Sequence, residues 1–148
     1  MKAKEYLQLL NKYDILIDAK SEKIQRLKAL AEKTTKIFTD TGNVQTSYKN
    51  DVLEDSVIKI MELQKELNVE VKEMLEVQED IERMINNLKN NNYCEILYKR
   101  YVYKYTWEKI AVEMNYNITW VQVLHGRALA EIQKVLDKKE ETERNKNK

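Results

Sequence analysis

The sequence predicts an all-α protein in which a long antiparallel coiled-coil helical hairpin precedes a small helical domain. Proline is absent and glycine occurs only twice among 148 residues, which argues against sheets because their tight turns usually need these residues. Apolar residues recur in steps of three and four over two long stretches, which indicates helices. The charged fraction of 34% fits the solvated faces of such helices.

The first predicted helix runs from about residue 4 to residue 33. Its seam has the heptad spacing of a coiled coil, with Lys20 filling one slot. The apolar seam residues are Tyr6, Leu10, Tyr13, Ile17, Ile24, Leu27 and Ala31. Further leucines, including Leu7 and Leu30, widen the apolar face, so we expect this helix to pack against more than one neighbour.

Residues 34–50 interrupt this pattern. They contain six Ser or Thr residues and Gly42, so we predict a loop. Asp51 and Glu54 have the spacing of an N-cap and its reciprocal partner, which predicts the start of a second long helix. Its apolar seam residues are Leu53, Val57, Ile60, Leu67, Val71, Met74, Ile81, Ile85 and Leu88.

Two seam slots of the second helix hold Gln64 and Gln78. Buried polar residues in a coiled coil often fix register, so these two either set the helix pairing or lie at a looser, solvated part of the seam. A hairpin over residues 1–90 buries one seam and leaves part of its apolar face exposed. We therefore predict a homodimer, most simply a four-helix bundle, or a higher homo-oligomer.

Residues 91–138 are predicted to form a separate domain. Asparagines between residues 86 and 92 mark a joint, and a support helix is expected over 93–105. Thr106 caps the next helix, with Ala111 at a helix crossing and Asn115 at a left-handed turn. The inward positions are Ile110, Met114, Tyr116, Val121 and Leu124. This pattern fits a helix-turn-helix, although any amphipathic helical hairpin would share it. The charged tail, residues 139–148, is expected to be disordered.

A helix-turn-helix lays its second helix in a DNA groove, so the exposed residues around the start of that helix are candidates for DNA contact. The candidate DNA-binding residues are Thr106, Lys109, Asn117, Thr119, Trp120, Gln122, Val123 and Arg127. Gln122 is suited to hydrogen-bond an adenine, and Thr119 to contact a phosphate or a thymine methyl. Residues 91–139 hold eight Lys or Arg against five Asp or Glu, an excess that suits double-stranded DNA as a partner.

Some of these candidates have a second interpretation. Thr119 and Gln122 also have capping-box spacing, which would tie Gln122 to the backbone. Arg127 could instead pair with an acid inside the domain. Trp120, if exposed, could anchor a partner protein, since Trp is enriched at binding hot spots.

The sequence predicts no catalysis. His125 is the only histidine and Cys94 the only cysteine, so we expect surface or packing roles for both, with no metal site and no disulfide. A Gly-rich phosphate loop and a nucleophile constellation are both absent, so no enzyme activity, cofactor or small-molecule substrate is expected. No stretch has the apolar length of a membrane span, and residues 1–10 do not form a signal peptide; we expect a cytoplasmic protein without a membrane partner.

Residues 96–132 resemble the promoter-reading C-terminal domain of bacterial sigma factors. There, a helix ending in Arg-Tyr, here Arg100 and Tyr101, precedes a Thr/Ser-Trp/Leu-Glu-x-Ile-Ala helix, here residues 106–111. The second helix carries a Val and an Arg-Ala-Leu run, here Val121 and residues 127–129. The resemblance implies a sigma-like helix-turn-helix. The outward positions that are usually basic in such domains are here Ile118, Trp120, Gln122 and Val123.

The whole chain is more similar to a family of small phage and prophage proteins of unassigned function. These open with Ala-Lys-Glu-Tyr-Leu, here residues 3–7, and end with the same domain and a Leu-His-Gly-Arg-Ala-Leu run, here residues 124–129. The resemblance implies a phage transcriptional regulator in the bacterial host cell that reads promoter DNA, contacts RNA polymerase, or does both. The alternatives are a small terminase-like DNA-packaging subunit and a protein-interaction adaptor that has lost DNA binding.

Overall fold

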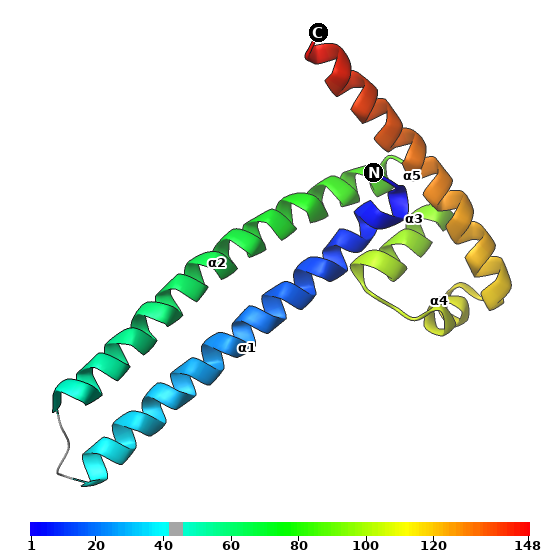
Figure 1. The fold of residues 1–148 in the computed structure, drawn as a ribbon. Helices are drawn as coiled ribbons and strands as arrows, with labels where there is room; N and C mark the ends of the chain where they lie inside the picture. The colour runs from blue at the N-terminus through cyan, green and yellow to red at the C-terminus, as the bar shows by residue number, and fades with distance from the viewer. Residues whose placement is uncertain (42–45) are drawn as a thin grey trace. The chain divides into compact units, whose positions relative to one another are not determined.

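The computed structural model describes residues 1–41 and 46–148, with the side chains of residues 37–50 left out, and its regular elements are all helical (Figure 1). No strand occurs among these described residues, so the predicted all-α class is confirmed. The elements are α1 (Ala3–Thr41), α2 (Thr46–Asn86), α3 (Asn91–Leu97), the π-helical turn η1 (Tyr98–Val102), α4 (Trp107–Met114) and α5 (Ile118–Lys146).

The chain divides into two compact units, and both long helices contribute to each. Unit 1 consists of residues 1–12 and 74–148, and unit 2 of residues 13–73. The division differs from the predicted boundary near residue 90. The reason lies in the apolar face of α1, where Leu7 and Leu10 are buried together with Ile81 of α2 and Ile132 of α5. As expected from its width, this end of α1 packs against more than one neighbour.

Within unit 2 the segments of α1 and α2 lie side by side and run in opposite directions (Figure 1). Ile24 of α1 and Leu63 of α2 are the most deeply buried side chains here, each 4% exposed. Ile24 was a predicted seam residue, whereas Leu63 was not, and the prediction placed Val57 and Gln64 in the seam of α2. Val57 is 51% exposed, and exposed Gln64 bonds Asn68 on its own helix. Burying Leu63 gains apolar burial and leaves the Gln64 amide in water, so at this turn the buried position lies one residue earlier than predicted.

Among the described residues, Lys20 makes a polar contact across unit 2. Its ammonium group pairs with Glu70 and lies 3.5 Å from Glu66 Oε2. The side chain of Lys20 is 27% exposed, so this ion pair is partly shielded from water. Gln78 in unit 1, the other glutamine placed in the seam, bonds Glu82 on its own helix. Both glutamines bond within α2, and exposed Gln64 fits the second interpretation, a solvated part of the seam.

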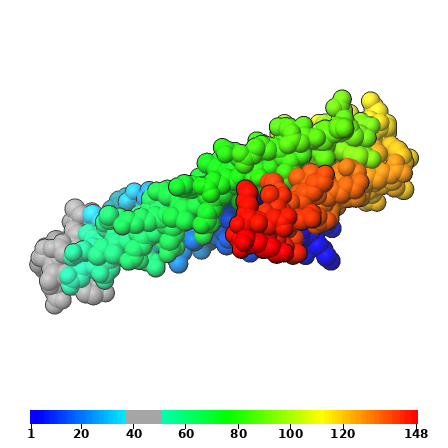
Figure 2. Space-filling model, turned by 90° about the horizontal axis from the view of Figure 1, so that it is seen from above, coloured from blue at the N-terminus to red at the C-terminus, as the bar shows by residue number. Residues whose placement is uncertain are grey.

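Three helix ends differ from the prediction. Most of the predicted 34–50 loop is helical, because α1 continues to Thr41 and α2 already begins at Thr46, before Asp51; residues 42–45 of that prediction lie outside the described residues. Within this extension of α1 the Thr35 hydroxyl donates to the Ala31 carbonyl oxygen one turn back, at 2.9 Å. The expected disordered tail forms the last turns of α5, drawn in red on an exposed surface (Figure 2).

Contacts at the end of unit 1 support this extension of α5. The N-terminal ammonium lies 2.9 Å from Glu140 Oε1, and Lys139 Nζ donates to Asp80 Oδ1 at 2.7 Å. Gln133 Oε1 accepts a hydrogen bond from the Ala3 backbone N–H at 2.7 Å, which satisfies a free donor in the first turn of α1. The chain start and α5 are therefore tied together.

We predict that Ile132→Ala destabilises the protein by about 2–5 kcal/mol, because Ile132 is fully buried and its removal leaves a cavity between α5 and the rest of unit 1. The matched control is Val123→Ala on the same helix, where 40% of the side chain is exposed. Thermal or urea denaturation measures both variants. Equal losses in the two would contradict this assignment of the core.

Candidate nucleic-acid interface

Helix α4, a short turn and the start of α5 follow one another with well-defined caps. The Thr106 hydroxyl accepts a hydrogen bond from the Lys109 backbone N–H at 3.2 Å and so caps α4. Asn115 ends α4 in the left-handed conformation, with φ 58° and ψ 39°. Asn117 Oδ1 then accepts from the Trp120 backbone N–H at 2.7 Å. The predicted cap and turn residues are confirmed, and the competing cap at Thr119 is excluded because Asn117 occupies that position.

A small apolar cluster fixes α4 against α5. Ile96 of α3, Ile110 and Ala111 of α4, and Val121 and Leu124 of α5 are all at most 6% exposed. Half-buried Met114 and Tyr116 pack against them, as the sequence pattern predicted. Because Ala111 is small, the two helices can approach closely at this point.

The opposite side of α5 faces solvent over its first three turns. All eight candidate residues lie on the surface of unit 1 and are exposed. On α5, Trp120, Val123 and Arg127 follow the spacing of one helix face, with Thr119 and Gln122 next to them. Thr106, Lys109 and Asn117 lie on or beside α4 and its turn. The geometry thus brings the α5 candidates onto one surface.

Some Lys and Arg side chains of unit 1 form ion pairs, whereas others lie against aromatic rings. Lys99 is paired with Glu95 and Glu113, and Lys134 with Glu131. The Arg127 guanidinium lies 5.4 Å from the centre of the Trp120 ring, and Lys109 Nζ lies 3.8 Å from that of Tyr105. Among the described residues neither of these two cations has an ion-pair partner. Arg127 therefore does not pair with an acid inside the domain.

An aromatic stack behind this surface was not predicted from the sequence. The Tyr101 hydroxyl lies 2.7 Å from His125 Nε2, and the two rings are stacked with centroids 5.7 Å apart. The Trp107 ring meets His125 edge-on, and the Arg100 guanidinium lies 4.3 Å from the centre of the same Trp107 ring. No local signal links Tyr101 to His125, because 24 residues separate them in the chain.

Burial and nearby cations keep His125 neutral. Burial lowers its pKa to about 4, and the charges of Lys4 and Arg100 act in the same direction. Burial also raises the pKa of Tyr101 to about 12, so the hydrogen-bonded pair carries no charge at neutral pH. Of the two expected roles, His125 has the packing role.

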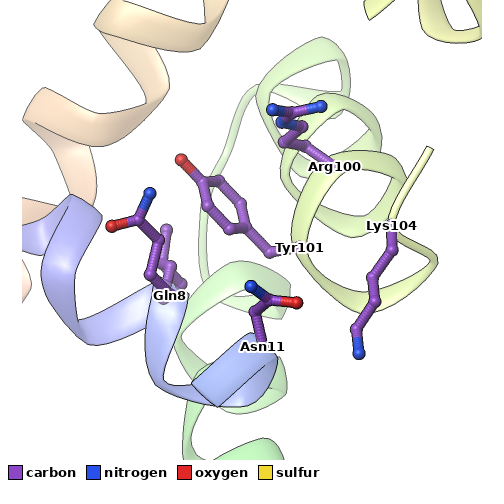
Figure 3. A pocket seen from close by; sticks show the side chains of 6 residues that line it. Gln8, Asn11, Arg100, Tyr101 and Lys104 are labelled. Carbon is purple, nitrogen blue, oxygen red and sulfur yellow. The ribbon is translucent and has the colours of Figure 1, made fainter. Parts of the chain in front are cut away.

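A cavity of about 230 Å³ opens beside this stack (Figure 3). Its lining residues are Leu7, Gln8, Asn11, Arg100, Tyr101 and Lys104. In this lining burial lowers the pKa of Lys104, whereas Tyr101 is uncharged and engaged with His125, its own pKa raised by burial. Burial likewise raises the pKa of Cys94, whose thiol lies 3.1 Å from the Ile85 carbonyl oxygen.

Two searches of the described residues concern other kinds of site. Among the described side chains, those of residues 1–36 and 51–148, no group of three or more His, Cys, Asp or Glu could hold a metal ion. In the same part of the chain, no helix has the length and apolar character needed to cross a lipid bilayer. Comparison with protein-family models, curated proteins and solved structures gave no match to this chain.

We predict how the free energy of unfolding changes when the pH is lowered from about 7 to 4.5. It should fall by up to about 3 kcal/mol more in the wild type than in the His125→Gln variant. Unfolded, His125 binds a proton near its ordinary pKa of 6.5, whereas in the fold it does so only near 4. Between these values the unfolded state binds more protons, so stability is lost as the pH falls. Urea denaturation across this range measures the difference. Parallel pH profiles for the two proteins would contradict the assignment.

Proposed function

We propose that this chain is a phage-type transcriptional regulator that binds promoter DNA, contacts RNA polymerase, or does both, through a sigma-like helix-turn-helix formed by α4 and α5. The observation that carries the proposal is the exposed start of α5, opposite its buried face. Thr119 and Gln122 are solvent-accessible there and have the hydroxyl and amide groups that hydrogen-bond base edges.

Positive charge for phosphate contact would come from Arg127 and Lys109. Both are exposed and rest against aromatic rings, which leaves their charge free of any carboxylate among the described residues. Each phosphate that such a cation neutralises releases counterions, so the affinity for DNA should fall as salt is added.

Gly126 supports close approach to the backbone of α5. A glycine inside a helix costs about 1 kcal/mol relative to alanine. A Cβ at Gly126 would meet no atom within 4 Å, so packing within the protein does not require the glycine. Gly126 lies one turn after Val123 on the exposed side of α5. The absence of a side chain there leaves room for a phosphate or a base edge.

In this proposal α1 and α2 form a coiled-coil hairpin that dimerises. Seven large apolar side chains among the described residues of unit 2 are 39–60% exposed: Ile15, Leu16, Leu30, Val57, Ile58, Met61 and Val69. Exposed apolar surface of this kind favours association between copies of the chain. A small terminase-like packaging subunit would use the same surface to build a ring.

The apolar residues at the start of α5 favour a second candidate, a protein-interaction adaptor. Trp120 is 39% exposed, and Ile118 and Val123 are each 40% exposed. None of the three can contribute charge to a phosphate contact. In this candidate RNA polymerase or another protein is held by Trp120, and Arg127 contributes little.

We predict that Arg127→Ala weakens binding to a preferred promoter duplex by at least about tenfold, because a charge-assisted hydrogen bond to phosphate is lost. The salt dependence should also decrease by about one released counterion. Fluorescence anisotropy at several salt concentrations, with intergenic duplexes from the source genome, measures both. Arg144→Ala, an exposed arginine on the same helix, is the control and should change neither.

Binding that is insensitive to salt, or equal affinities for Arg127→Ala and the wild type, would contradict DNA reading by this surface. The adaptor candidate then requires that Trp120→Ala abolishes capture of RNA polymerase while Arg127→Ala retains it.

We further predict that the protein sediments at twice the mass of one chain at micromolar concentration. The double change Ile58→Glu and Met61→Glu should convert it to a monomer, because it introduces charge into the exposed apolar face. Lys138→Glu on exposed α5 is the control and should remain dimeric. A wild-type monomer would contradict self-association, and a larger ring would support the packaging subunit.

A further inference from the structure

Three tyrosines form a row on the surface of unit 1, outside the exposed face of α5. The centre of the Tyr103 ring lies 6.2 Å from that of Tyr98 and 5.8 Å from that of Tyr105. The rings are tilted by 34° and 41°, so none of them covers the face of the next completely. Tyr103, in the middle, is 59% exposed, whereas Tyr98 and Tyr105 are half-buried. The row is therefore anchored at both ends and open at its centre.

An unusual backbone holds the row together. The Tyr103 backbone N–H donates to the Tyr98 carbonyl at 2.9 Å, the five-residue step of a π-helical turn. This step brings Tyr103 back over Tyr98, whereas in a regular α-helix the two side chains would point to different sides. Lys104 then has a positive φ of 60°, which is costly for a residue other than glycine. It lies between Tyr103 and Tyr105, whose rings are in contact.

Two such local distortions in seven residues call for an explanation. Burial of apolar surface does not supply one for Tyr103, because more than half of its side chain remains in water. Strained backbone and π-helical turns are frequent where a side chain is held for binding. What both distortions have in common is that they bring the Tyr103 ring into the row.

Positive charge accompanies the tyrosines. Residues 98–109 contain four Lys or Arg and one acid, Glu108. Lys109 Nζ lies 3.8 Å from the centre of the Tyr105 ring, which places charge at that end of the row. The nearby carboxylates of Glu95 and Glu113 are both paired with the ammonium group of Lys99. Lys109 therefore offers an anionic chain a cation at the Tyr105 end of the row.

We propose that this tyrosine row binds unpaired nucleobases of a single-stranded nucleic acid, with Tyr103 as the stacking platform and Lys109 beside the phosphates. Aromatic rings bind every base through its flat face, and cations next to them hold the backbone. Duplex DNA offers no free base face to Tyr103, so this activity is distinct from duplex reading by α5. It does not depend on the proposed transcriptional role.

The test uses the full-length protein and fluorescently labelled oligothymidylate and oligouridylate of about 12 nucleotides. Fluorescence anisotropy should detect binding of at least one of them. Tyr103→Ala should weaken that binding by about tenfold, the loss expected for one stacked base. Tyr103→Phe retains the ring and should bind within about twofold of the wild type. The difference between the DNA and RNA oligomers identifies the natural strand.

Two control measurements test whether single-strand binding and duplex binding use different surfaces. Tyr103→Ala should leave the affinity for a duplex unchanged, while Arg127→Ala should leave the affinity for the single strand unchanged. Because Tyr103 is mostly exposed, its alanine variant should also keep the wild-type melting temperature. No binding of either oligomer, equal affinity for Tyr103→Ala, or an equal loss in Tyr103→Phe would each overturn the proposal.

Discussion

The packing of one helix, α5, against everything else in unit 1 is the constraint on which that unit depends. Its buried face enters both apolar clusters: Val121 and Leu124 pack with α3 and α4, and Ile132 and Leu136 pack with the ends of α1 and α2. Because α5 is one uninterrupted helix of 29 residues, these contacts share a single rigid axis. The exposed start of α5 is therefore fixed relative to the N-terminal residues of α1, where the Ala3 backbone N–H donates to Gln133.

His125 lies on α5 between the residues of these two clusters, where a charged group would be costly. Its contact with Tyr101 joins η1 to α5 and supplies the hydrogen bond that a buried imidazole needs. The low pKa of His125 expresses the same constraint, since burial disfavours the charged form and the charges of Lys4 and Arg100 act in the same direction. The uncharged Tyr101–His125 pair therefore holds the π-helical turn η1 against the first turns of α5.

The features that could be predicted from the sequence depend on contacts between residues close together in the chain. Thr106, Asn115 and Asn117 bond or turn the backbone within a few residues, so their roles follow from residue type and spacing. The exposed candidates on α5 follow from helix periodicity in the same way. By contrast, the choice of Leu63 over Gln64 depends on the partner helix, because both positions fit a heptad repeat.

The remaining features depend on distant or unusual contacts. Tyr101 meets His125 across 24 residues, and nothing near either one indicates the other. The tyrosine row requires a positive φ at Lys104, a residue type that gives no signal for that conformation. The extent of unit 1 was missed for a similar reason, since the periodicity of α1 shows which residues are apolar but does not identify their partners.

Lys109 links the two surfaces proposed to bind nucleic acid. Its backbone N–H completes the cap of α4, while its ammonium group lies over Tyr105 at one end of the tyrosine row. The cap fixes the start of α4, and α4 in turn packs against α5, so the charge of Lys109 has a defined position relative to both surfaces. Both proposed surfaces therefore draw on the charge of Lys109, whereas Arg127 belongs to the α5 surface alone and Tyr103 to the tyrosine row alone.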